Sequence, residues 1–233
     1  DFGPTFTYAD WNCNQIIASA LPVSATIGLS AISLAVLIGV PVGVISAVRR
    51  GGWLDAGLLA FVLIGISVPT FVAGAALLIV FGVVLKVAPV GGWGTLSHLP
   101  LPAITLALPF IAYIARLTRM SMLDALQSDF VRTALAKGLA PRTVIWKHAL
   151  KPAFLPVLSF LGPATAQAMT GSFVVEKVFG VPGLGQHFVN AALNRDVGLI
   201  LATVLVFATL LVIFNLLVDV LYAVIDPRVT EAV

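Results

Sequence analysis

Ionisable side chains gather in one stretch of this chain, residues 119–151, and their types suit docking to a partner rather than covalent chemistry. This basic segment carries six basic residues and two acids, at Arg119, Arg132, Lys137, Arg142, Lys147 and Lys151 and at Asp124 and Asp129. The pattern predicts a solvated basic loop, an amphipathic helix on anionic lipid or a helical element that fits a groove on a cytoplasmic partner. The pattern alone leaves these alternatives open.

Motifs for catalysis and metal binding are missing from the sequence. No Gly-x-x-x-x-Gly-Lys-Ser/Thr run offers a cradle for ATP phosphates, and no Gly-x-Ser-x-Gly elbow offers a nucleophile. The histidines, His98, His148 and His187, lack metal-site spacing, and the single Cys13 allows no disulfide within the chain. We therefore predict no enzyme activity, no catalytic residue, no metal site and no cofactor bound by this chain.

Local signals divide the basic segment into two short helices around a glycine. Ser121 followed by Asp124 predicts a capping box that opens the first helix. Gly138 suits a left-handed residue at the end of that helix, Pro141 suits the start of the second, and Pro152 limits it. Apolar residues recur at helical spacing along the first helix, at Met122, Leu123, Leu126, Phe130, Val131, Ala134 and Leu135.

The rest of the chain is built for lipid. Of its 233 residues, 60% are hydrophobic and 10% are charged, whereas soluble domains carry about 25% charged residues. The net charge of +3 gives little support to nucleic-acid binding. We predict an all-α, polytopic transmembrane bundle in a single domain, 1–233. Its five spans are expected at about 21–48, 57–85, 101–117, 153–175 and 197–225.

Several residues inside these spans carry specific expectations. Gly39 and Gly43 predict a face where another helix approaches closely, with a generic glycine-tolerant span as the alternative. Pro69 predicts a kink in the second span. Asp219, four residues after Asn215, is the one acid well inside a span, and we favour a structural partner for it over a proton site. Polar residues of the fourth span are candidates to line a path, namely Thr165, Gln167 and Thr170.

The distribution of Lys and Arg predicts the orientation. Ten lie on the side of the basic segment and three on the other, at Lys86, Lys177 and Arg195, which places the basic segment in the cytoplasm. Asp1 is then outside and Val233 inside. Residues 176–196 are then an outer loop, and a compact fold of this loop is favoured by Gly180, Pro182, Gly183 and Gly185. Residues 186–194 are expected to form a short helix within it.

The basic segment also carries a family resemblance. The run Asp129–Leu139, followed by His148–Pro156, resembles the signature loop of bacterial ABC-importer permeases. The general pattern is Glu-Ala-Ala, three residues, Gly, nine residues and Ile-x-Leu-Pro. This chain has Arg132-Thr133-Ala134 and His148-Ala149-Leu150-Lys151 instead. The oligopeptide/dipeptide branch is similar in these departures, and its B-type subunits are similar over nearly the whole chain.

The resemblance implies a type I ABC-importer permease fold in the bacterial cytoplasmic membrane. The family has six spans, so the first is expected to be missing from this chain. The implied partners are a second homologous permease, two cytoplasmic ATPase subunits that bind ATP and Mg, an extracytoplasmic substrate-binding protein and membrane lipid, with no nucleic acid. The implied cargo is peptides. Other members of the branch move nickel complexes, opines and sugars.

The resemblance also assigns candidate sites. The ATPase contact is expected at Phe130, Arg132, Thr133, Ala134, Leu135, Lys137, Gly138, Leu139 and Pro141. The glycine-rich part of the outer loop is a candidate for contact with the binding protein or for an outer gate, with a mere connector as the alternative. Two other functions stay open, an ATP-independent secondary carrier and a non-transporting scaffold. A single shallow acid and no internal repeat disfavour the carrier.

Overall fold

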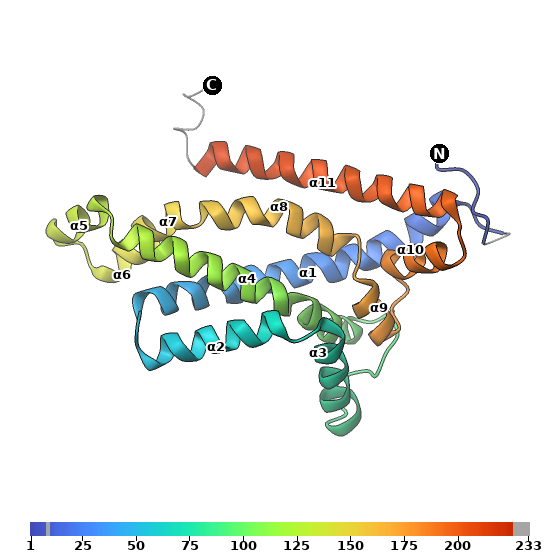
Figure 1. The fold of residues 1–233 in the computed structure, drawn as a ribbon, viewed down its shortest axis with the longest axis horizontal. Coiled ribbons are helices and arrows are strands. Elements are labelled where there is room, and N and C mark those ends of the chain that lie inside the picture. Colours follow the sequence, from blue (N-terminus) through green and yellow to red (C-terminus); the bar gives the residue numbers. More distant parts are fainter. Residues whose placement is uncertain (8–9, 226–233) are drawn as a thin grey trace.

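The computed structural model describes residues 1–7 and 10–225, and this part of the chain is helical with no strand. The all-α prediction is thus confirmed. Figure 1 shows α1, α4 and α8 running side by side through the middle, with α11 along α8 and α2 along the opposite flank. The α-helices are α1 (Cys13–Val48), α2 (Trp53–Ser67), α3 (Thr70–Leu77), α4 (Pro100–Leu126), α5 (Asp129–Ala136), α6 (Pro141–Thr143), α7 (Leu150–Ala153), α8 (Leu155–Met169), α9 (Phe173–Phe179), α10 (Leu184–Leu193) and α11 (Val197–Ile225). Wider π-helical turns follow α3 at Leu78–Val84 and α6 at Val144–Ala149, and a 3-10 turn, Leu96–His98, precedes α4.

Glycine lets α1 and α4 touch backbone to backbone. A Cβ built on Gly39 would lie 2.9 Å from the carbonyl oxygen of Ile111, and one on Gly43 would lie 2.5 Å from that of Ala115. Both distances are shorter than any relaxed carbon–oxygen contact, so no side chain fits at either position. The close-approach face predicted at Gly39 and Gly43 is confirmed.

Length and composition allow three to five membrane crossings within the described residues. Three helical stretches are long and apolar enough to cross alone, namely Cys13–Val48, Leu96–Leu126 and Val197–Tyr222. Two bent pairs could each supply another crossing: Trp53–Ser67 with Thr70–Val84, bent by 103°, and Pro141–Ala153 with Leu155–Met169, bent by 54°. The first bend lies at Pro69, where the sequence predicts a kink, and it separates α2 from α3 completely.

Several predicted boundaries differ from the structure, and the first is the start of α1, which lies at Cys13 instead of about residue 21. The capping box at Ser121 is wrong, because α4 continues through it to Leu126 and buries Met122 and Ala125 against the core. The first independent helix of the basic segment is α5, which starts at Asp129. The helix of the fourth span ends at Met169 instead of reaching 175, and a break at 170–172 separates it from α9.

One buried carboxylate anchors the start of α11. Asp196 Oδ1 accepts the N–H of Leu199 at 3.1 Å, which caps the helix. Its other oxygen accepts the Thr5 hydroxyl and the N–H groups of Phe6 and Thr7, the latter two at 2.9 and 3.0 Å. These bonds hold the N-terminal residues against the end of the outer loop. Farther along α11, Asn215 faces Gly162 of α8, and Asp219 is exposed on the surface of this chain.

Candidate functional site

The turn after α5 is a Schellman motif built on Gly138. The N–H of Gly138 donates to Leu135 O at 2.9 Å, and the N–H of Leu139 donates to Ala134 O at 3.3 Å. Gly138 has φ +82°, and a Cβ there would meet nothing within 4 Å. Glycine is therefore required by backbone conformation and not by space. Pro141 then opens α6 at its first turn, so the helix–glycine–helix prediction holds from Asp129 onward.

Apolar contacts join the basic segment rigidly to the rest of the molecule. Val131 and Ala134 of α5 are 3% and 7% exposed and pack in one cluster with Val144 and Ala149 of the following turns. The same cluster continues through Met122 of α4 into the α1–α4 interface. Because interiors are close-packed, a force on α5 is transmitted to these helices and not absorbed by a loose loop.

The opposite face of the segment is exposed and apolar as well as basic. Phe130 is 47% exposed, Leu135 46% and Leu139 40%. Of the nine residues predicted to contact an ATPase, only Ala134 is buried; the other eight, Phe130, Arg132, Thr133, Leu135, Lys137, Gly138, Leu139 and Pro141, are exposed. Trp146, in the π-helical turn that follows α6, is a further exposed apolar side chain of the segment, at 42%. The sequence pattern gives no signal for Trp146, because the apolar stripe of the segment ends at Leu135.

An ion pair braces the base of the basic segment. Arg119 of α4 donates from Nε to Asp55 Oδ1 and from a terminal nitrogen to Oδ2, both at 2.9 Å. Asp55, 3% exposed in the first turn of α2, also accepts the Ser46 hydroxyl and the N–H of Gly51. This bidentate geometry fixes the turn between α1 and α2 against α4. The sequence indicates Arg119 only as one charge of the basic segment and gives no signal for Asp55.

A second buried carboxylate organises the outer loop. Glu176 of α9 is 2% exposed. Its Oε1 accepts the Ser24 hydroxyl of α1 at 2.7 Å, and its Oε2 accepts the N–H of Gln186 at 2.8 Å. Ser24 Oγ in turn accepts the N–H of Leu184 at 2.8 Å. Burial raises the pKa of Glu176, although these hydrogen bonds oppose the shift.

The glycines predicted in the outer loop fall into two groups. Gly180 ends α9 in a left-handed conformation with φ +60°, and it is exposed together with Pro182. Gly183 and Gly185 are buried. A Cβ on Gly183 would collide with the Glu176 carboxylate. Gly180 and Pro182 are therefore accessible to another protein. Gly183 and Gly185 make room for the Glu176 carboxylate. The predicted short helix is α10, which runs from Leu184 to Leu193.

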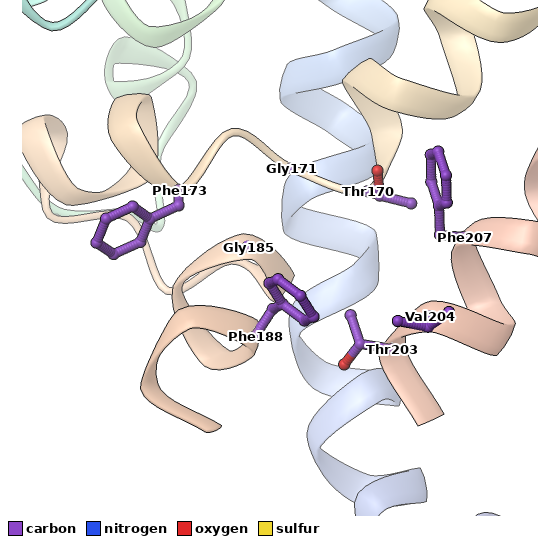
Figure 2. A pocket seen from close by; sticks show the side chains of 8 residues that line it. All are labelled: Thr170, Gly171, Phe173, Gly185, Phe188, Thr203, Val204 and Phe207. Atoms are coloured by element: carbon purple, nitrogen blue, oxygen red, sulfur yellow. The ribbon is translucent and has the colours of Figure 1, made fainter. Parts of the chain in front are cut away.

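Two cavities flank α8, and two of the three polar residues predicted to line a path border one of them each, whereas Thr165 borders neither. Gln167 lines a larger cavity of about 370 Å³ between α3, α4 and α8. Thr170 lines a smaller cavity of about 260 Å³ bounded by α10 and α11. Figure 2 shows its aromatic lining, Phe173, Phe188 and Phe207. Thr165 is 7% exposed, and its hydroxyl donates to Leu161 O of its own helix at 2.6 Å.

The family of the chain follows from a match that includes the basic segment and both cavities. Residues 39–231 match the family model described as "Binding-protein-dependent transport system inner membrane component". The chain belongs to this family. Its members are membrane-integral permease components of ABC importers, and the long apolar helices of this permease agree with that class.

Relatives and solved structures support the same assignment. The permease is 49% identical over 231 residues to the oligopeptide transport system permease protein OppB of Salmonella typhimurium, with 98% of this chain and 76% of that protein covered. It is 42% identical to the dipeptide transport system permease protein DppB of Bacillus subtilis, with 98% and 74% covered.

The fold is that of solved type I ABC-importer permeases. A structure of the MetNI methionine ABC transporter in an inward-facing conformation matches with a TM-score of 0.68 at 17% identity, covering 91% of this chain and 97% of that chain. A crystal structure of an amino acid ABC transporter with histidines matches with a TM-score of 0.63 at 16% identity, covering 89% and 93%. The predicted fold class is thereby confirmed.

Proposed function

We propose that this permease is the pore-forming subunit of an ATP-driven importer that moves oligopeptides or dipeptides across the bacterial cytoplasmic membrane. The single observation that carries the proposal is the basic segment, which is exposed on one face and packed into the transmembrane core on the other. The identity to oligopeptide and dipeptide transport permeases supports peptides as the cargo.

The segment has the form of a mechanical link. In the proposed mechanism, Leu135 and Leu139 fill a groove on an ATPase subunit, and Arg132 and Lys137 add polar contacts at its rim. ATP and Mg²⁺ bind to the two ATPase subunits and not to this chain. When the ATPases close on ATP, α5 moves with them. The packed cluster and the Arg119–Asp55 pair carry that movement to α1, α2 and α4.

The remaining partners follow from the same assembly. A second homologous permease faces this one to complete the translocation path, and lipid surrounds both. An extracytoplasmic binding protein delivers the peptide to the outer loop, where Gly180 and Pro182 offer exposed contacts. The basic segment then lies in the cytoplasm and Asp1 outside. Val233, proposed to be cytoplasmic, and Arg228 of the charge tally lie outside the described residues.

Reconstitution tests this function directly. The complete complex in proteoliposomes, supplied with the binding protein and a radiolabelled tripeptide, is expected to accumulate peptide only with hydrolysable ATP on the cytoplasmic side. Vesicles that lack the ATPase subunits are the control. Peptide uptake in that control, driven by an imposed proton gradient, would instead identify a secondary carrier.

A further inference from the structure

Two helix breaks meet at the larger cavity. Thr70 is the first residue of α3, just after the sharp bend at Pro69, and no side chain caps this helix start. Gly171 and Ser172 form the break between α8 and α9. Non-helical backbone at membrane depth is stable only where protein covers it or where it lines a polar cavity. Broken helices in transporters accordingly mark places where the cargo is held.

The lining of the larger cavity combines one amide and several hydroxyls with an aromatic wall. Gln167 supplies both a donor and an acceptor, and Thr70, Tyr113 and Ser172 supply hydroxyl groups. Tyr113 stacks on Phe160 with ring centroids 4.3 Å apart, and Phe110 lies 6.4 Å from the same ring. Tyr113 is 48% exposed, so its ring and hydroxyl are accessible.

Charge is missing from this lining. None of the described residues that border the cavity is ionisable at neutral pH. The nearest charged residue along α4 toward the basic segment, Arg116, borders a different small cavity between α1, α2 and α4. A charged peptide side chain would therefore find no ionic partner here, whereas a peptide bond would find both a donor and an acceptor.

We propose that the larger cavity is a main-chain subsite on the translocation path, where Gln167 hydrogen-bonds a peptide group of the cargo and the Tyr113–Phe160 wall packs against it. This inference rests on the proposed peptide-import function and adds its recognition rule. The subsite recognises the peptide backbone and does not discriminate between charged and neutral side chains. Its contribution is the same for acidic, neutral and basic peptides.

Transport kinetics test the recognition rule. In the reconstituted complex, Gln167→Leu is expected to raise the apparent KM for uptake about fivefold, the effect of losing one neutral hydrogen bond. The rise should agree within about twofold for a neutral, an acidic and a basic tripeptide. Thr203→Val, in the smaller cavity, is the control and should leave KM unchanged. An effect confined to one charge class, or no effect for any peptide, overturns the proposal.

Photo-cross-linking locates the peptide. Benzoylphenylalanine replaces Tyr113 in one variant and Phe207, which borders the smaller cavity, in the other. Radiolabelled peptide, delivered during ATP turnover, is expected to label the permease from position 113 and not from 207. Uptake that proceeds while 113 labels only lipid or the second permease overturns the subsite and leaves the import function standing. Absence of all peptide uptake by the unmodified complex instead refutes the import function itself.

Discussion

Replacing Arg119 by Met is expected to destabilise the permease far more than replacing any exposed arginine. The change leaves Asp55, 3% exposed, as a buried carboxylate without a cationic partner. Only the Ser46 hydroxyl and the Gly51 N–H then still donate to it. Breaking a buried ion pair in this way costs about 3–5 kcal/mol.

A double-mutant cycle separates the pair from its surroundings. Asp55→Asn removes the stranded charge and keeps one oxygen acceptor, so the double variant Asp55→Asn with Arg119→Met should lose far less stability than the two single changes added together. We expect a coupling of about 2–3 kcal/mol. The measurement is reversible unfolding of the purified permease in mixed micelles, followed by tryptophan fluorescence.

The chain supplies its own matched control. Arg132 and Asp129 also form an ion pair, at 3.5 Å, but their side chains are 73% and 95% exposed. Arg132→Met should therefore change the unfolding free energy by less than about 1 kcal/mol. The reasoning is refuted if Arg119→Met costs no more than Arg132→Met, or if the Asp55 and Arg119 effects simply add.

Three further predictions concern single residues. Gly138→Val should strain the left-handed turn by at least about 1–2 kcal/mol and lower the peptide uptake per ATP hydrolysed, while membrane insertion persists. Gly138→Asn should retain more of this coupling between hydrolysis and uptake. Equal coupling in the two variants would contradict the conformational argument. Gly43→Ala should destabilise the α1–α4 contact. Gly57→Ala, with open space around the glycine, should instead stabilise α2 by about 0.5–1 kcal/mol. Melting temperatures that shift in the same direction in both variants would count against this packing. The pKa of Glu176 is raised above its ordinary 4.5, so its contribution to stability is full below that value and is lost as pH rises through the folded-state pKa. Glu176→Gln should flatten this pH dependence of the unfolding free energy relative to the parent. An unchanged pH profile would exclude Glu176 as its source.

Local backbone requirements were predictable from the sequence. Gly138 and Pro141 specify a helix end and a helix start within four residues, and the structure has both. Gly39 and Gly43 specify a close helix contact because they lie one turn apart on one face, and α4 fills it. In each case the chemistry of the residue itself decides the outcome.

Long-range pairing was not predictable. Arg119 and Asp55 are 64 residues apart, and Glu176 and Ser24 are 152 apart. Nothing local in either acid indicates its partner. The error at Ser121 has the same origin, since burial of Met122 and Ala125 against the core extends α4 past a plausible cap. Likewise, polarity selected Thr165, Gln167 and Thr170 together, and only the packing of α8 separates them.

The central claim is that the exposed face of the basic segment docks on an ATPase subunit, and site-directed cross-linking tests it most directly. A cysteine in place of Leu139, 40% exposed, is joined to the nearest cysteine of the ATPase by a short bifunctional reagent in the assembled transporter. Leu193→Cys, 76% exposed at the end of α10, is the control. The account predicts an ATPase adduct from position 139 and none from 193. An assembled, transport-competent complex that gives no ATPase adduct from position 139, or gives one from 193, would contradict it.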